Sequence, residues 1–229
     1  LTLARTADGE ETRRIHALPS EERTIAEALS DAGYFTALIG KWHLGLDYDY
    51  PELKWHAVNR GFDEAFKFMG RGAHDYFELK GIKGDYSAIY RNKKRLEEDE
   101  YEGYLTTRLS EEAVAFIDRE KDNPFFLYLA YNAVHTPAQA PQADIDFYKN
   151  KFPHLSETRA TLMAMLQHLD DGVGAVVDKL KQENVWDNTL LFFLTDNGGA
   201  SAMEADNGHL RDFKPVSYTH LTLPTNREV

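Results

Sequence analysis

Three groups of polar residues, far apart in the chain, each follow a short apolar run of strand length. The groups are Lys41 with His43, His135, and Asp196 with Asn197. In an open α/β sheet the carboxyl ends of parallel strands share one edge, and ligands bind just outside that edge. Alone, each group is more typical of a surface lysine, a structural histidine or a turn. Because three runs end this way, we expect the groups to meet at one site.

The residue types in these groups suit the binding and cleavage of an oxyanion ester. The oxygens of Asp196 and Asn197 are hard ligands, which suit Ca²⁺ or Mg²⁺ and suit zinc poorly. Such a cation neutralises charge on the non-bridging oxygens of the ester, and Lys41 offers a point charge for the same oxygens. His43 or His135 can donate a hydrogen bond or carry a proton to a leaving alcohol. No serine or threonine lies beside these groups as an obvious nucleophile.

Alternating helices and strands must position these groups. The predicted helices cover Thr24–Ala32, Leu105–Glu120 and Ser156–Lys181, and the predicted strands cover Tyr34–Ile39, Phe125–Ala130 and Leu190–Thr195. Thr24 and Glu27 fit a capping box at the start of the first helix. The continuous apolar run FFLYLA is typical of a strand buried on both faces. This order predicts parallel strands joined by right-handed crossovers within one α/β domain.

Residues 44–103 show little regular patterning, because aromatic residues alternate there with glycines and charges. We interpret this region as long ordered loops with a small hairpin near Tyr86–Arg95. Loops of this length in a compact domain are usually functional.

Composition excludes several classes of protein. The formal net charge of -12 argues against nucleic acid or an anionic membrane surface as a partner. The chain has no cysteine, which excludes disulfides, thiolate metal sites and cysteine nucleophiles. No apolar run approaches the ~18 residues of a membrane span. The first residues lack the pattern of a signal peptide, and because the chain does not begin with Met, we expect its start to be missing. Its oligomeric state is left open.

Several long motifs, in this order, resemble the sulfatase family. GYFTALIGKWHLG (residues 33–45) is similar to the second signature of that family, and the resemblance continues through RGFDEAF, GAHDYF, FFLYLAYNAVHTP, LDDGVG and DNTLLFFLTDNGG. It covers about residues 17–214 of the chain. The resemblance implies an alkaline-phosphatase-like α/β domain, in which a mostly parallel sheet has helices on both faces and which hydrolyses sulfate esters.

The resemblance also implies roles for individual residues. Lys41 and His43 match the active-site lysine and histidine of the family, and His135 matches its substrate-contacting histidine. Asp196 and Asn197 match two Ca²⁺ ligands, with Mg²⁺ the less favoured ion. NGHLRDFK (residues 207–214) resembles the segment that carries a second, substrate-binding lysine, which is Lys214 here.

The chain also departs from the family pattern. The family nucleophile is a formylglycine made from the Cys or Ser of a C/S-x-P-S-R motif, and neither this motif nor the N-terminal Asp-Asp pair of metal ligands is present. Both are expected upstream of residue 1. We therefore expect residues 1–215 to be a catalytic domain truncated at both ends, and the chain to be inactive as it stands. Residues 216–229 resemble a translated transposase sequencing adapter and are expected to be a non-native tail.

Two other functions stay open beside a sulfate ester hydrolase. One is a phosphate or phosphonate monoester hydrolase on the same fold, and the other is a non-catalytic relative that binds sulfated glycans. The family resemblance implies a carbohydrate or aryl sulfate as substrate. It also implies a periplasmic or secreted protein, although no signal peptide lies in the chain.

Overall fold

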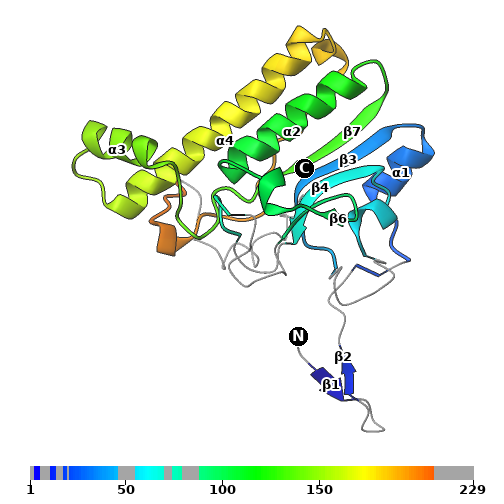
Figure 1. The fold of residues 1–229 in the computed structure, drawn as a ribbon, viewed down its shortest axis with the longest axis horizontal. Coiled ribbons are helices and arrows are strands. Elements are labelled where there is room, and N and C mark those ends of the chain that lie inside the picture. The colour runs from blue at the N-terminus through cyan, green and yellow to red at the C-terminus, as the bar shows by residue number, and fades with distance from the viewer. Residues whose placement is uncertain are drawn as a thin grey trace, which may run out of the picture.

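The structure is a computed structural model that describes residues 18–19, 21–45, 55–69, 74–78 and 88–208, with the backbone of two short strands before them. Its centre is a five-stranded sheet with the order β6-β5-β4-β3-β7 (Figure 1). The strands of this sheet are β3 (Phe35–Trp42), β4 (Glu64–Met69), β5 (Ile89–Arg91), β6 (Lys94–Arg95) and β7 (Phe125–Ala130). A separate antiparallel pair joins β1 (Leu3–Arg5) to β2 (Glu11–Arg13).

The sheet is parallel where the candidate site lies. β3 pairs in parallel with β4 on one side and with β7 on the other. β5 and β6 continue the sheet in antiparallel fashion beyond β4. The carboxyl ends of β3, β4 and β7 therefore share one edge, as the order of helices and strands predicted for β3 and β7.

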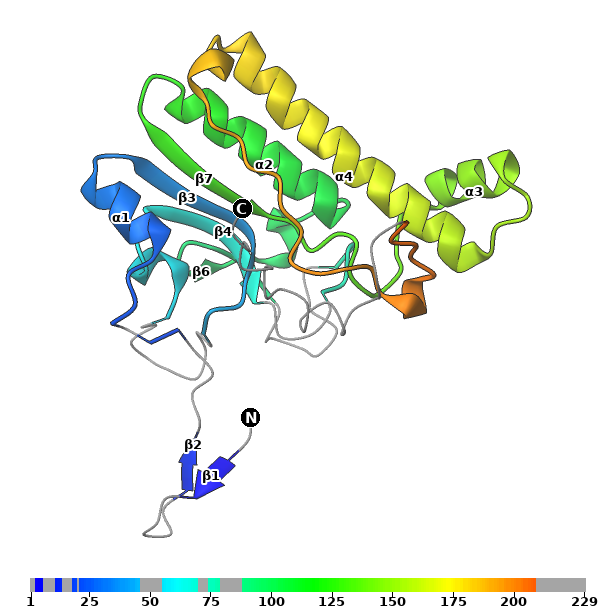
Figure 2. The same cartoon turned by 180° about the vertical axis from the view of Figure 1, so that it is seen from behind.

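Four α-helices accompany the sheet, and they are α1 (Ile25–Asp31), α2 (Leu105–Glu120), α3 (Gln142–Lys151) and α4 (Glu157–Gln182). Four short 3-10 helices complete the described elements, and they are η1 (Ala57–Asn59), η3 (Glu98–Glu100), η4 (Trp186–Asn188) and η5 (Ser201–Met203). α2 and α4 run side by side, and α1 lies apart from them at the other side of the sheet (Figures 1 and 2). The predicted fold class, with helices on both faces of a mostly parallel sheet, is confirmed.

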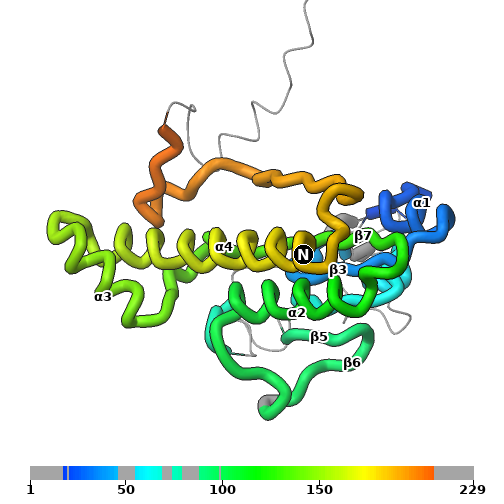
Figure 3. Tube along the Cα trace, turned by 90° about the horizontal axis from the view of Figure 1, so that it is seen from above, coloured from blue at the N-terminus to red at the C-terminus, as the bar shows by residue number. Residues whose placement is uncertain are grey.

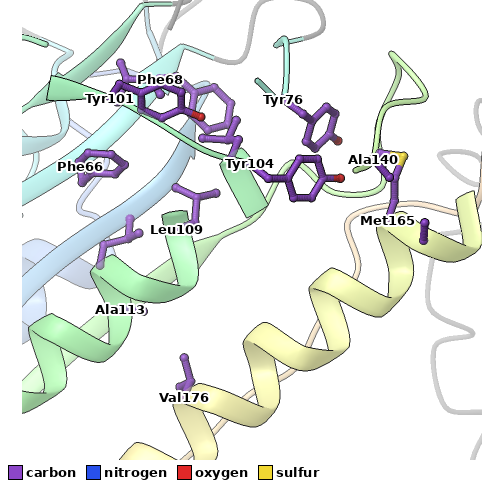
Figure 4. Close-up of a cluster of buried hydrophobic side chains, with 14 of the residues drawn as sticks. Phe66, Phe68, Tyr76, Tyr101, Tyr104, Leu109, Ala113, Ala140, Met165 and Val176 are labelled. Carbon is purple, nitrogen blue, oxygen red and sulfur yellow. The ribbon is translucent and has the colours of Figure 1, made fainter. Parts of the chain in front are cut away.

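The hydrophobic core has two parts because strand residues alternate between the two faces of the sheet. The larger part joins one face to α2 and α4, and Figure 4 shows several of its members, including Phe66, Leu109 and Met165. The smaller part joins the other face to α1 through Ala26, Leu38 and other buried residues. Both faces of β3 are thus buried.

The locally encoded predictions are confirmed. Thr24 caps α1, since its Oγ1 accepts the N–H of Glu27 at 3.0 Å while the Glu27 carboxylate accepts the N–H of Thr24 at 2.7 Å. α2 and β7 have the predicted bounds, and α4 differs from its predicted range by one residue at each end. β5 and β6 form the hairpin predicted near Tyr86–Arg95.

Besides the separate pair β1–β2, one strand of the main sheet and one α-helix were missed. β4 lies in the region interpreted as loops, because Lys67 interrupts its apolar pattern although this lysine is fully buried. α3 was also missed, since it carries many polar residues and buries only Ile145. Both elements depend on tertiary packing more than on local pattern.

The predicted strand Leu190–Thr195 is wrong. The structure has no strand there, and Leu190, Phe192 and Leu194 expose 80%, 74% and 84% of their surface. Figure 3 shows this segment passing alongside α4, on the side opposite α2. A strand needs a neighbour that satisfies its backbone, and the part of the sheet that the structure describes ends at β7.

Candidate active site

The register between β3 and β7 brings two of the three predicted groups to one edge of the sheet. Gly40 pairs with Ala130, the last residue of β7. Lys41 and His43 follow Gly40, and His135 lies in the loop that follows Ala130. Lys41 is half-buried and His43 is exposed. The shared edge is observed, whereas the roles of the three side chains stay predictions.

Gly40 is the residue that allows this close pairing. Its φ is +114°, and a Cβ at this position would lie 2.0 Å from the carbonyl oxygen of Ala130. No other residue fits there without moving a strand. The Gly-Lys order at the end of β3 therefore has a physical reason, since the glycine lets β7 approach β3 closely at the residue before Lys41.

Trp42 fixes the end of β3 from the face of the sheet opposite to the one on which Lys41 lies. Its indole N–H donates to the carbonyl oxygen of Trp55 at 2.7 Å, and its ring packs edge-on against Phe62 with centroids 5.9 Å apart. Because side chains alternate along a strand, Lys41 lies on the other face, the one covered by α2. The tryptophan fixes the backbone from which the lysine projects.

The loop after β7 holds the His135 ring in one orientation. The backbone N–H of His135 donates to the carbonyl of Asn132 at 2.8 Å, which closes a turn. The Nδ1 atom of the ring lies 2.8 Å from the carbonyl oxygen of Thr136. A carbonyl only accepts, so this bond requires the hydrogen on Nδ1. Nε2 is then the ring atom available to a substrate.

The segment Asp75–Tyr76, from the GAHDYF motif, supports the same loop. The hydroxyl of Tyr76 donates to the carbonyl oxygens of His135 and Asn132, at 3.0 and 3.2 Å. Gln139, further along the loop, accepts the N–H of Tyr76 at 3.0 Å and donates to Asp75 at 2.8 Å. Sequence reasoning gave these residues no role. The only signal was the motif itself, because their partners lie far away in the chain.

The RGFDEAF motif has a structural role. The guanidinium of Arg60 lies 3.1 Å from the Glu27 carboxylate and donates to the carbonyl of Glu22 at 2.6 Å. The Asp63 carboxylate accepts the backbone N–H of Thr36 at 2.8 Å. Burial raises the pKa of Glu27, but hydrogen bonds from Thr24 and Arg60 outweigh it and leave the pKa below its usual value. The motif therefore fastens α1 to the start of β3, at the end of the strand far from the candidate site.

The LDDGVG motif lets two helices approach closely. A Cβ on Gly172 of α4 would lie 2.1 Å from the hydroxyl oxygen of Ser110 on α2. That hydroxyl is 2.7 Å from the hydroxyl of Tyr131, the first residue after β7. Gly172 thus sets how near α4 lies to the beginning of the His135 loop.

The third predicted group does not join the other two through the sheet, because the strand before it is not formed. Asp196 is exposed. Asn197 lies in a turn, in which its side-chain amide donates to the carbonyl of Gly198 at 2.9 Å and its own carbonyl accepts the hydroxyl of Thr195 at 2.8 Å. Lys214 lies outside the described residues. Convergence of these three with the β3–β7 edge stays a prediction.

The donor set fits Ca²⁺ in type but not in number. Asp196 and Asn197 offer hard oxygens, whereas Ca²⁺ takes six to eight of them. Within the described part of the chain, no group of three or more histidine or acidic side chains could hold a metal ion. The described residues therefore supply part of a calcium site at most.

No described helix is long and apolar enough to cross a membrane.

Comparison with known proteins decides the family. The model of the family described as Sulfatase matches residues 4–221. The chain belongs to the sulfatase family. It is 32% identical to the uncharacterized sulfatase YdeN of Escherichia coli K12 over 88% of this chain and 37% of that protein. It is 30% identical to human N-acetylgalactosamine-6-sulfatase over 83% of this chain and 35% of that protein.

Solved structures agree with the family. The crystal structure of Ps i-CgsB in complex with k-i-k-neocarrahexaose has a TM-score of 0.72 and 38% identity, over 83% of this chain and 43% of that chain. The crystal structure of the PsFucS1 sulfatase from Pseudoalteromonas sp. has a TM-score of 0.58 and 26% identity, over 81% of this chain and 40% of that chain. The sulfatase chain described here spans about a third of the length of the curated relatives it matches.

Proposed function

We propose that the whole protein, of which this chain is a part, hydrolyses sulfate esters of carbohydrates or aryl alcohols. The observation that carries the proposal is the shared edge at which β3 delivers Lys41 and His43 and β7 delivers His135. Family membership says which oxyanion ester such an edge serves. Export to the periplasm or the outside belongs to the same proposal and rests on the family alone.

The residues of the edge have distinct tasks in this reaction. Lys41 holds the sulfate oxygens by charge, in a site where fixed charges replace solvent. His135 faces the ester with Nε2, because its Nδ1 bonds to the Thr136 carbonyl. When the sulfur–oxygen bond breaks, a proton reaches the leaving alcohol from His43, or from Nε2 of His135 if that ring carries a proton on both nitrogens. Lys214, beyond the described residues, is assigned as a second lysine for the same oxygens.

Two groups of the proposed site come from elsewhere. A formylglycine upstream of residue 1 would supply the attacking hydroxyl, and residues of the same upstream segment would join Asp196 and Asn197 around Ca²⁺. The chain by itself is then inactive. Residues 216–229 lie outside the described residues, and their assignment as a non-native tail stays a prediction.

Exposed apolar surface supports the proposal that residues 1–215 form an incomplete domain. β7 is wholly apolar in sequence, yet it is the last strand of the described sheet and Tyr128 is 48% exposed. The apolar segment 190–194 is more exposed still. Monomeric proteins rarely leave such patches uncovered. A further strand beside β7 would give this segment the neighbour it lacks.

The substrate class follows from the relatives, in the form of a proposal. One solved relative, Ps i-CgsB, was solved in complex with k-i-k-neocarrahexaose. A sulfated carbohydrate is the substrate that we propose, with aryl sulfates as convenient surrogates.

The test compares the sulfate and the phosphate monoester of one aryl alcohol as substrates of the full-length protein. We expect turnover of the sulfate ester to exceed that of the phosphate, and His135→Ala to lower it about 100-fold or more. His154→Ala, which changes an exposed histidine, is the matched control. Faster turnover of the phosphate ester would instead support the alternative function, a phosphate or phosphonate monoester hydrolase. Binding of a sulfated glycan without turnover would identify a non-catalytic relative.

A further inference from the structure

We propose that Tyr76 is a positioning residue for His135, acting through the backbone of the loop that carries this histidine. The loop comprises residues 131–139. The proposal rests on the proposed function for the task of His135, whereas the contacts that support it are geometric. Tyr76 comes from the segment after β4, so it links the carboxyl ends of two strands that do not pair with each other.

The hydroxyl of Tyr76 meets both ends of the turn in which His135 lies. It is shared between the carbonyl oxygens of His135 at 3.0 Å and Asn132 at 3.2 Å. The Asn132 carbonyl also accepts the backbone N–H of His135 at 2.8 Å. The Tyr76 hydroxyl therefore fixes the backbone of this turn, and its hydrogen bonds go to backbone carbonyls rather than to the imidazole of His135.

The surroundings of Tyr76 make it a fixed donor. Its side chain is fully buried, and its ring stacks on Tyr104 with centroids 5.4 Å apart (Figure 4). Burial, with a smaller electrostatic contribution from Tyr104, raises the pKa of Tyr76 far above its usual value, so the phenol keeps its hydrogen at every working pH. Removing this hydroxyl leaves the His135 carbonyl without this donor, whereas the Asn132 carbonyl keeps the backbone N–H of His135.

A second set of contacts ties the far end of the loop to the same segment. Gln139 accepts the N–H of Tyr76 at 3.0 Å and donates to Asp75 at 2.8 Å. The hydroxyl of Tyr104, the N-cap residue that precedes α2, donates to the carbonyl of Gln139 at 2.9 Å. The loop is thus held at its beginning and at its end, and the bond from Tyr104 fixes its position relative to helix α2.

The orientation of the His135 ring depends on this backbone. Nδ1 bonds to the carbonyl of Thr136, the next residue, at 2.8 Å. If the turn relaxes, this carbonyl rotates away. The Thr136 hydroxyl, 3.3 Å from Nδ1, can donate to that atom as well as accept from it, so the hydrogen is then no longer required on Nδ1. Loss of the Tyr76 hydroxyl should therefore change which ring nitrogen faces the substrate.

Kinetics of the full-length protein test whether Tyr76 acts through His135. We expect Tyr76→Phe, which keeps the ring and removes the hydroxyl, to lower kcat for an aryl sulfate about 10- to 100-fold with a smaller change in KM. Tyr101→Phe is the matched control, because its buried hydroxyl has no hydrogen-bond partner among the described residues. In a His135→Ala background, Tyr76→Phe should cause no further loss. An equal loss in both backgrounds would overturn the proposal.

A readout without turnover keeps this test apart from that of the proposed function. With ¹⁵N-labelled histidine, the neutral His135 ring should show its hydrogen on Nδ1 in the unmodified protein and in Tyr101→Phe. In Tyr76→Phe a larger share should appear on Nε2. An unchanged ring in Tyr76→Phe would refute the positioning role, even if the protein hydrolysed sulfate esters. A changed ring would support it, even if the substrate proved to be another ester or the His135→Ala variant had no measurable activity.

Discussion

β7 and the segment 190–194 are alike in sequence and unlike in structure. Both are apolar runs that end in polar residues of family motifs. β7 pairs with β3 along its whole length and packs against α2, for example through Phe125 on Phe116 with centroids 5.4 Å apart. The second run has no strand partner in the described structure, and Phe192 and Phe193 are 74% and 70% exposed. Hydrophobicity alone does not make a strand, because the backbone needs a neighbour.

The difference extends to the polar residues that follow. After β7, the backbone of the His135 turn is fixed by Tyr76, a residue of another segment. After the segment 190–194, Asn197 lies in a turn with hydrogen bonds to Thr195 and Gly198. The arrangement after β7 can hold the His135 ring in a fixed orientation for catalysis. The arrangement after the segment 190–194 is expected to gain its function when a neighbouring strand is present.

The largest effect is expected at the contact between β3 and β7. Gly40→Ala places a Cβ 2.0 Å from the Ala130 carbonyl at a φ of +114°. The free energy of unfolding should fall by about 3–5 kcal/mol, the sum of overpacking and backbone strain. Urea denaturation measures the change. Gly174→Ala, on helix α4 where nothing lies within 4 Å, is the control and should be neutral or stabilising. Equal stability of both variants would contradict the described register.

The next largest effect is expected from acid, which should lower the free energy of unfolding by protonating a buried histidine between β3 and β4. His56 is buried, and burial lowers its pKa to about 4, while its Nδ1 accepts the N–H of Val58 at 3.2 Å. The unfolded state binds this proton at higher pH than the folded state, so stability is present above pH 6.5 and lost as pH falls toward 4. The loss should be on the order of 3 kcal/mol. His56→Asn, which cannot titrate, should flatten the profile between these pH values, and an unchanged profile would assign the effect to other groups.

A pair of phenylalanine substitutions compares the two runs directly. Phe125→Ala should lower stability by about 2–3 kcal/mol, because this ring packs on Phe116. Phe192→Ala should change it by less than about 0.5 kcal/mol in the chain of 229 residues. In the full-length protein, the Phe192 variant should become clearly destabilising if the segment forms a strand there. The same small effect in both proteins would show that the segment stays uncovered.

The smallest effect is expected where the second run is fastened to the rest of the molecule. Glu204 accepts the Ser156 hydroxyl at 2.6 Å, and its carbonyl accepts from Arg159 at 2.6 Å, both at the start of α4. Glu204→Gln replaces the charged acceptor of the Ser156 hydroxyl by a neutral one and leaves the backbone carbonyl in place, so global stability should fall by about 0.3 kcal/mol or less, because the contact is exposed. Hydrogen exchange should nevertheless quicken at residues 196–207. Unchanged exchange would mean that other contacts hold this segment.

The sequence predicted the elements whose signals are local. The Thr24–Glu27 capping box and the apolar stripe of α4 need only neighbouring residues, and both were found from pattern. β4 was missed because the burial of Lys67 is decided by packing. The predicted strand at 190–195 was wrong because no strand of the described structure pairs with this segment. The role of Tyr76 could not be predicted, since the two carbonyls that it bonds lie 56 and 59 residues away.

The central proposal is that the β3–β7 edge forms part of the active site of a sulfate ester hydrolase. The most direct test is aryl sulfate turnover by the full-length protein with Lys41→Met, compared with Lys67→Met. Lys67 is fully buried on the other face of the sheet, 5.2 Å from the ring of Tyr90, and burial lowers its pKa to about 7. We predict that Lys41→Met loses about 100-fold or more of the turnover, whereas Lys67→Met keeps it. Full turnover in Lys41→Met would contradict the account.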